Sequence, residues 1–95
     1  MGCPMQTFNN VTNGVWQCLV AKAAAAGITV NTNTGSAGKF GVKIAWAYDP
    51  AAQTLQLQAV QHGFFGCGMI NGKIHDVMTE CYAAHGAAMG VMLDH

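Results

Sequence analysis

Cys67 is the residue whose surroundings most favour chemical reactivity. It stands between Gly66 and Gly68 in a glycine-rich loop, directly before a segment with helical spacing. Backbone N–H groups at a helix N-terminus stabilise a thiolate and lower the pKa of a thiol. A thiolate here is a candidate nucleophile, with His62 as its candidate general base. The alternative is that Cys67 is one half of a disulfide or a small buried side chain, and this alternative is favoured because no third group orients the pair.

Cys81 and His85 are the second pair of groups that could do chemistry. They are four residues apart, so they share one face of a helix predicted in this region. Met78, Met89 and Met92 add soft sulfur ligands, and such a set would suit Cu(I) or haem iron. Two ligands do not make a zinc site, and the sequence contains neither CxxC nor HxxxH. We therefore expect no cofactor and assign the methionines to a core or an interface.

The four cysteines allow three disulfide pairings in an oxidising compartment. One pairing is excluded by distance, because Cys67 precedes the predicted helix and Cys81 lies well inside it. At ~1.5 Å per residue the two would stand ~15 Å or more apart, beyond the reach of a disulfide. Cys67 would then pair with Cys18 or Cys3, while free buried thiols at Cys18 and Cys81 fit the sequence equally well.

Five aromatic residues support a binding hypothesis. Phe64 and Phe65 are adjacent and flanked by glycines, so they cannot both point inward from an extended segment. One of them faces a pocket or a partner in this interpretation. Together with Trp16, Trp46 and Tyr48 they could line an apolar cavity between sheet and helices, as in small ligand carriers. The alternative is that a domain of this size places its aromatic side chains in the core.

Composition limits the class of protein. The 95 residues suffice for one domain, 52% are hydrophobic, and only 8% are charged, against roughly 25% in typical soluble proteins. Four basic and four acidic residues cancel, so the chain lacks the positive charge with which proteins hold nucleic acid. Near-zero net charge also removes the repulsion that keeps small proteins apart, which favours self-association. No stretch approaches the ~20 apolar residues of a membrane span.

The sequence is compatible with two cellular compartments. The N-terminal residues lack the basic and apolar regions of a signal peptide, which indicates the cytoplasm by default. Scarce charge beside abundant Asn, Gln, Thr and Gly is equally typical of an exported protein whose signal has been removed.

Hydrophobic spacing predicts the secondary structure. The surest element is a hairpin, because Phe40, Val42, Ile44, Trp46 and Tyr48 alternate with smaller or polar residues before the turn at 49–53. Asn9 or Asn10 is the expected cap of the first helix and Gly27 its left-handed end. The predicted elements are a helix over 10–26, a strand over 28–32, strands over 40–49 and 54–62, and a helix over 70–85, with a turn at 33–38 before the second strand.

These elements predict an α+β fold with the order α-β-β-β-α. The expected architecture is a three-stranded antiparallel meander with both helices packed on one face, in a single domain 1–95 whose ends, 1–8 and 87–95, are less ordered. The side chains on the opposite face of the sheet are mostly small and uncharged, so a second subunit is expected to pack there. They belong to Lys43, Ala45, Ala47, Gln56, Gln58 and Val60.

Three functional hypotheses follow from the sequence. The first is a small non-enzymatic, self-associating module, a homodimer, that presents an apolar pocket or surface to a small apolar ligand or a protein partner. Its ligand-binding residues would be Phe64, Phe65, Trp46, Tyr48 and Trp16. The second is a thiol-dependent enzyme or redox protein that uses Cys67 with His62. The third is a soft-metal or haem binder that uses Cys81, His85 and the methionines.

Overall fold

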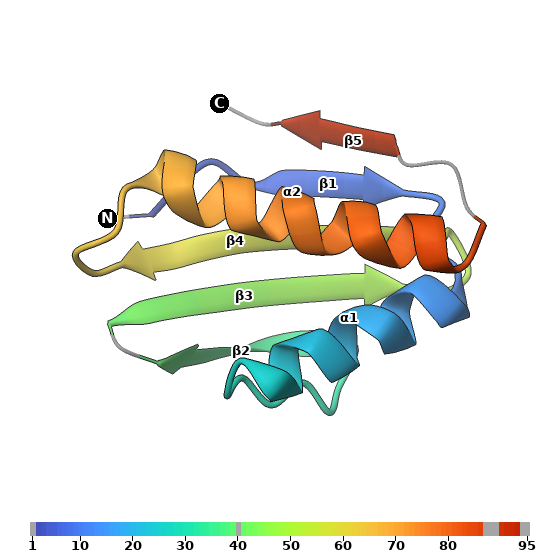
Figure 1. Cartoon of the computed structure of the whole chain (residues 1–95), viewed down its shortest axis with the longest axis horizontal. Coiled ribbons are helices and arrows are strands. Elements are labelled where there is room, and N and C mark those ends of the chain that lie inside the picture. The colour runs from blue at the N-terminus through green and yellow to red at the C-terminus, as the bar shows by residue number, and fades with distance from the viewer. Residues whose placement is uncertain (1, 40, 87–89, 94–95) are drawn as a thin grey trace.

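The structure is a computed structural model that describes residues 2–39, 41–86 and 90–93. It is an α+β fold in which one antiparallel sheet carries both helices on the same face (Figure 1). The strands lie in the order β2-β3-β4-β1-β5. The elements along the chain are β1 (Gln6–Asn9), α1 (Asn13–Ala25), β2 (Thr34–Lys39), β3 (Val42–Asp49), β4 (Thr54–His62), α2 (Cys67–Ala84) and β5 (Gly90–Leu93).

The predicted hairpin is confirmed as β3 and β4. Trp46 pairs with Leu57 and Tyr48 with Leu55 across the ladder, and all four side chains are buried on the face that the helices cover. The strands therefore alternate buried and exposed positions as the hydrophobic pattern requires. Phe40, the first residue of that pattern, lies outside the described residues.

The expected three-stranded meander is wrong in its number of strands and in its first strand. The sheet has five strands, and the segment 28–32 lies between α1 and β2 without being part of it. β2, over residues 34–39, pairs with β3 on the side away from β4. Most of this range had been predicted as a turn because it contains glycines. A Cβ on Gly35 would stand 3.1 Å from the Trp46 ring, and one on Gly38 would stand 2.6 Å from the carbonyl oxygen of Val42. These glycines permit close approach within the sheet.

Two short edge strands were also not expected. β1 pairs antiparallel with β4, and β5 pairs with β1. Four residues are too few for a visible alternation, although Gln6 and Phe8 on β1 are both buried. The ranges 1–8 and 87–95, for which less order was expected, contain most of β1 and all of β5, together with residues outside the described part of the chain.

Both predicted helices are present with shifted starts. α1 begins three residues later than expected because Thr12 is its cap, with the Thr12 hydroxyl accepting a 3.3 Å hydrogen bond from the Val15 N–H. Gly27 adopts a φ of +87°, which confirms it as the left-handed residue after the helix. α2 begins at Cys67, so the glycine-rich loop ends earlier than the sequence indicated.

The core lies between the sheet and the two helices. Its members are Phe8, Val11, Val15, Trp16, Trp46, Tyr48, Leu55, Leu57, Met78, Cys81 and Tyr82. The hydroxyl of Tyr48 donates a 2.7 Å hydrogen bond to the Val11 carbonyl, and that of Tyr82 donates to the Asn9 carbonyl. Both tyrosines thereby fix the β1–α1 connection, which sets where α1 begins to cross the sheet. A smaller cluster of Cys3, Ala59 and Ile70 lies beneath the start of α2.

Candidate functional site

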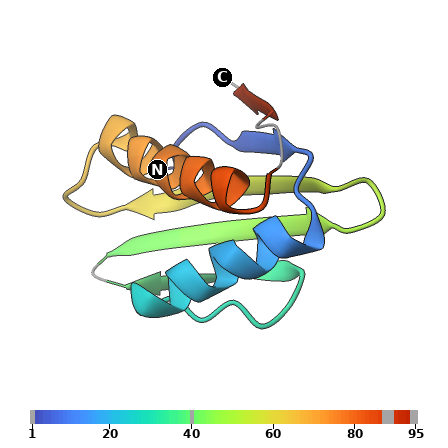
Figure 2. The same cartoon turned by 45° about the vertical axis from the view of Figure 1, so that its right-hand side comes forward.

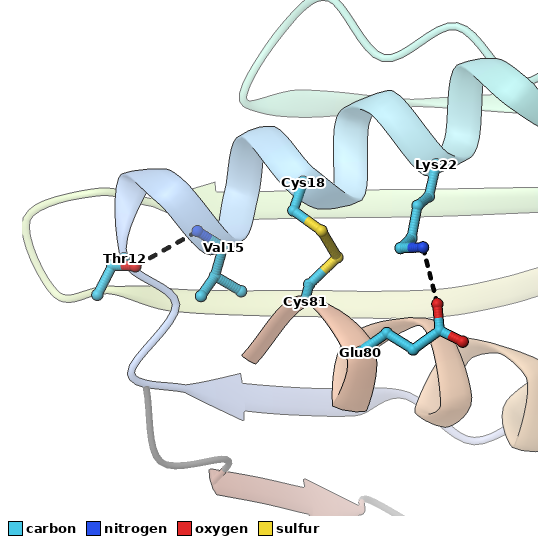
Figure 3. The surroundings of a disulfide bond; sticks show 6 residues. All are labelled: Thr12, Val15, Cys18, Lys22, Glu80 and Cys81. Carbon is cyan, nitrogen blue, oxygen red and sulfur yellow. Dashed lines mark hydrogen bonds and ion pairs between the residues drawn. A yellow bond between two sulfur atoms is a disulfide. The ribbon is translucent and has the colours of Figure 1, made fainter. Parts of the chain in front are cut away.

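The two helices form a V on the sheet. They run antiparallel, lie close together where α1 begins and α2 ends, and diverge toward the opposite end, as the view in Figure 2 also shows. A disulfide between Cys18 and Cys81 joins them at the closed end, with the two Cα atoms 5.6 Å apart (Figure 3). One turn further along α1, the Lys22 amine lies 2.7 Å from a carboxylate oxygen of Glu80. A covalent bond and an ion pair therefore set the spacing of the helices.

A pocket lies in the open part of this V. Its volume is about 170 Å³, and sheet residues Ile44, Trp46 and Leu57 form its floor. The walls come from α1, from the segment after it and from α2: Trp16, Leu19, Lys22, Ala23, Ala26, Ile28, Val30, Lys73, Ile74 and Val77. Every lining side chain except the two lysines and the indole N–H groups is purely apolar. The segment 28–32, which is not a strand, serves instead as one wall.

The two tryptophans at the pocket are held by contacts outside it. Trp16 stacks on Tyr48 with ring centroids 4.6 Å apart and an interplanar angle of 18°. The Trp46 indole N–H donates a 2.9 Å hydrogen bond to the Thr32 carbonyl. Because the indole N–H of Trp46 already has an acceptor, this ring offers the pocket apolar surface. The tryptophans line a wall whose shape is fixed before any ligand arrives.

The structure brings together some of the aromatic residues singled out from the sequence. Trp16 and Trp46 line the pocket. Tyr48 lies behind Trp16 in the core, where burial, with a smaller contribution from neighbouring Asp49, raises the pKa of its hydroxyl. Phe64 and Phe65 do not line the pocket and are exposed on the β4–α2 loop.

Sequence reasoning missed most of the aliphatic lining. Leu19, Ala23 and Ala26 lie three or four residues apart, along one stripe of α1 and its end. Its spacing was visible, but nothing in the spacing shows that the stripe is only partly covered. Ile28 and Val30 were read as strand residues, so no signal marked them as a pocket wall.

Cys67 is bonded to Cys3, with the Cα atoms 5.4 Å apart. Cys3 was one of the two partners that the distance argument had left open, and the excluded pairing with Cys81 does not occur. In this oxidised state the sulfur of Cys67 is not a free nucleophile, so the thiol hypothesis requires prior reduction. The nearby His62 has a buried Nδ1 atom with no hydrogen-bond partner in the structure.

Cys81 and His85 each contact a different part of α1. Cys81 is fully buried and bonded to Cys18, and the ring of His85 packs close to Gly14, where a Cβ would stand 2.7 Å from Nδ1. Met78 is buried in the core. Met89 lies outside the described residues, as does the side chain of Met92. Within the described ranges no group of three or more His, Cys, Asp or Glu side chains could hold a metal ion.

The sheet face opposite the helices is open. No described element covers it, and it carries the residues that the sequence had assigned to a second subunit. A shallow depression of about 120 Å³ lies there, lined by Met5, Ala45, Trp46, Ala47, Gln56 and Gln58. Its small side chains and amides offer shape and hydrogen bonds but no strong charge.

Neither of the two helices, as far as the chain is described, is long and apolar enough to cross a bilayer. No protein-family model, curated protein or solved structure matches this chain. The function is therefore inferred from the pocket and its lining alone.

Proposed function

We propose that this protein is a small non-enzymatic binding module that holds a small apolar ligand in the pocket between α1, α2 and the sheet. The observation that carries this proposal is a pocket of about 170 Å³ with an almost wholly apolar lining. A closed apolar cavity of about 150 Å³ is large enough to bind benzene. A ligand between benzene and indole in size therefore fits the space.

The walls are spaced before the ligand binds. The Cys18–Cys81 disulfide joins the helices at the closed end of the V, and the hydrogen bond of Trp46 fixes the floor. A pocket whose walls need little rearrangement loses less conformational entropy on binding, so more of the apolar contact energy remains as affinity. The fixed spacing of the helices therefore favours an open pocket that can accept a ligand.

The two lysines set the chemistry of the rim. Their methylene groups extend the apolar walls while their amines reach water. The Lys22 amine is already paired with Glu80. Any polar substituent on the ligand would therefore lie at the rim near Lys73, with its apolar body inside.

Toluene is a suitable probe because it matches the volume and carries no polar group. Titration of the ¹⁵N-labelled protein should shift the amide resonances of Leu19, Ala23, Ile44 and Val77 in a saturable manner. Ala23→Leu places three further carbon atoms in the pocket and should abolish these shifts. Ala21→Leu, on the exposed side of the same helix, should leave them unchanged. Absence of saturable shifts in the wild type, or equal shifts in Ala23→Leu, would exclude the proposed site.

We also propose that the open sheet face joins two copies of the chain. The net charge is zero, and Ala45 and Ala47 at the centre of that face let another sheet approach closely. Native mass spectrometry should find a dimer for the wild type and a monomer for Ala45→Lys. The control Ala83→Lys, on an exposed position of α2, should remain dimeric. A monomeric wild type at every concentration would contradict this assembly.

A further inference from the structure

The β4–α2 loop and the first turn of α2 expose apolar side chains that the core does not use. Phe64 is fully exposed, while Phe65 and Met69 are 42% and 66% exposed. Within residues 2–39 and 41–86, no other large hydrophobic side chain is exposed to this degree. We call these three residues the apolar tip. Large apolar side chains exposed close together in the sequence are candidates for a surface that a partner or a membrane covers.

The apolar tip stands on an ordered base. The Phe65 N–H donates a 3.0 Å hydrogen bond to the His62 carbonyl, and Gly63 has the positive φ, 56°, that this turn needs. Cys67, at the start of α2, is bonded to Cys3, whose own N–H donates a 2.7 Å hydrogen bond to a carbonyl of β4. The phenylalanines are therefore presented by a fixed turn, so that docking them costs little backbone entropy.

Lysines gather at this end of the molecule. The β2–β3 turn lies beside the β4–α2 loop, since a Cβ on Gly41 would stand 3.5 Å from the Cα atom of Gly63. Lys39 ends β2, but its side chain lies against the residue that follows α1, since a Cβ on Gly27 would stand 2.5 Å from the Lys39 amine. Exposed Lys43 is the second residue of β3. Exposed Lys73 lies on α2, one turn beyond the apolar tip. Two of the four lysines, Lys43 and Lys73, thus lie on elements that adjoin the tip.

The described carboxylates lie further away. Asp49 ends β3 at the opposite end of the sheet (Figure 1), about 23 Å from the start of that strand at ~3.3 Å per residue. Asp76 and Glu80 follow later on α2, and Glu80 is paired with Lys22. Lys43 and Lys73 therefore lie nearer the apolar tip than the described carboxylates do.

We propose that the apolar tip docks this protein onto an anionic lipid bilayer. Phe64, Phe65 and Met69 would enter the boundary between head groups and acyl chains, while Lys43 and Lys73 would face the anionic head groups. Aromatic side chains beside basic residues are the combination that binds such an interface, because it joins apolar burial to attraction by the surface potential. A protein partner would need acidic groups around an apolar cleft to match the same surface.

Flotation of the full chain with lipid vesicles tests this proposal. The wild type should float with vesicles of equal parts phosphatidylcholine and phosphatidylglycerol and much less with pure phosphatidylcholine. Phe64→Ser combined with Phe65→Ser should weaken binding about tenfold or more, from the loss of apolar burial. Lys43→Gln combined with Lys73→Gln should weaken it about fivefold for each lysine. The control Asp49→Asn, at the far end of the sheet, should bind as the wild type does.

Circular dichroism should show that the exposed phenylalanine variant folds normally, so that a loss of flotation reports on the surface. Equal flotation with neutral and anionic vesicles would overturn the proposal, because the lysines would then have no role. Absence of flotation would overturn it as well. If the wild type instead forms oligomers that Phe64→Ser disrupts, and does not float, a second copy of the chain covers the apolar tip.

Discussion

Removal of the Cys18–Cys81 disulfide is expected to destabilise the protein and to open its pocket. The bond joins residues 63 positions apart. A crosslink across a loop of that length lowers the entropy of the unfolded chain by an amount worth about 4 kcal/mol, and native disulfides typically contribute 2–4 kcal/mol. We expect Cys18→Ala combined with Cys81→Ala to lose about 3 kcal/mol. For a domain of this size that loss lowers Tm by about 12–24 °C.

The second disulfide provides a matched control. Cys3 and Cys67 are 64 positions apart, so loop closure predicts almost the same loss of stability when they are replaced. Only the Cys18–Cys81 bond joins the helices that form the pocket walls. Urea unfolding followed by circular dichroism should therefore give similar losses for the two double variants, whereas toluene affinity should fall in the first alone. A stability loss below about 1 kcal/mol, or unchanged toluene affinity in the first variant, would refute the view that this disulfide spaces the helices.

Three further measurements follow from single contacts. Gly38→Ala forces a Cβ against the backbone of β3 and should lower the free energy of unfolding in urea by about 1–3 kcal/mol. The matched change Gly72→Ala lies in open space within α2 and should raise the free energy of unfolding by about 1 kcal/mol. Tyr48→Phe removes a buried hydrogen bond worth about 1 kcal/mol. Because burial raises the pKa of the Tyr48 hydroxyl, its stabilising contribution is full below the ordinary tyrosine pKa and is lost as pH rises through the pKa in the folded protein. Thermal unfolding at alkaline pH should therefore show this loss of stability in the wild type and not in Tyr48→Phe. The hydrogen bond and charge of Lys22 lower the pKa of Glu80, so the stabilising contribution of this carboxylate is full above the ordinary glutamate pKa and is lost as pH falls through the lowered pKa. An NMR titration of Lys22→Met should find the Glu80 pKa returned toward its usual range.

Local patterns were sufficient for the parts of the fold in which side chains alternate over many residues. The β3–β4 hairpin was predicted because its buried and exposed positions follow one another for eight and nine residues. Both helices were predicted from apolar side chains at helical spacing, and the first also from Gly27 at its end. β2 was missed because Gly35 and Gly38 leave no hydrophobic pattern, and the reason for those glycines, close approach to β3, exists only once the strands are paired.

The candidate site was predictable only in part. Trp16 and Trp46 were singled out as large aromatic residues, and the structure places both at the pocket. The volume of the pocket depends on the spacing of the helices, which the Cys18–Cys81 bond fixes at the closed end of the V. Sequence spacing excluded one cysteine pairing but could not choose among the rest. The exposure of Phe64 and Phe65 likewise depends on how the β4–α2 loop turns away from the core.

The sharpest test of ligand binding between the helices is a crystal of the protein soaked in toluene. We expect electron density for one ring between α1 and α2, over Ile44 and Trp46, in the wild type and none there in Ala23→Leu. Helices that close onto one another and fill this space with their own side chains, or toluene found only elsewhere on the protein, would contradict it.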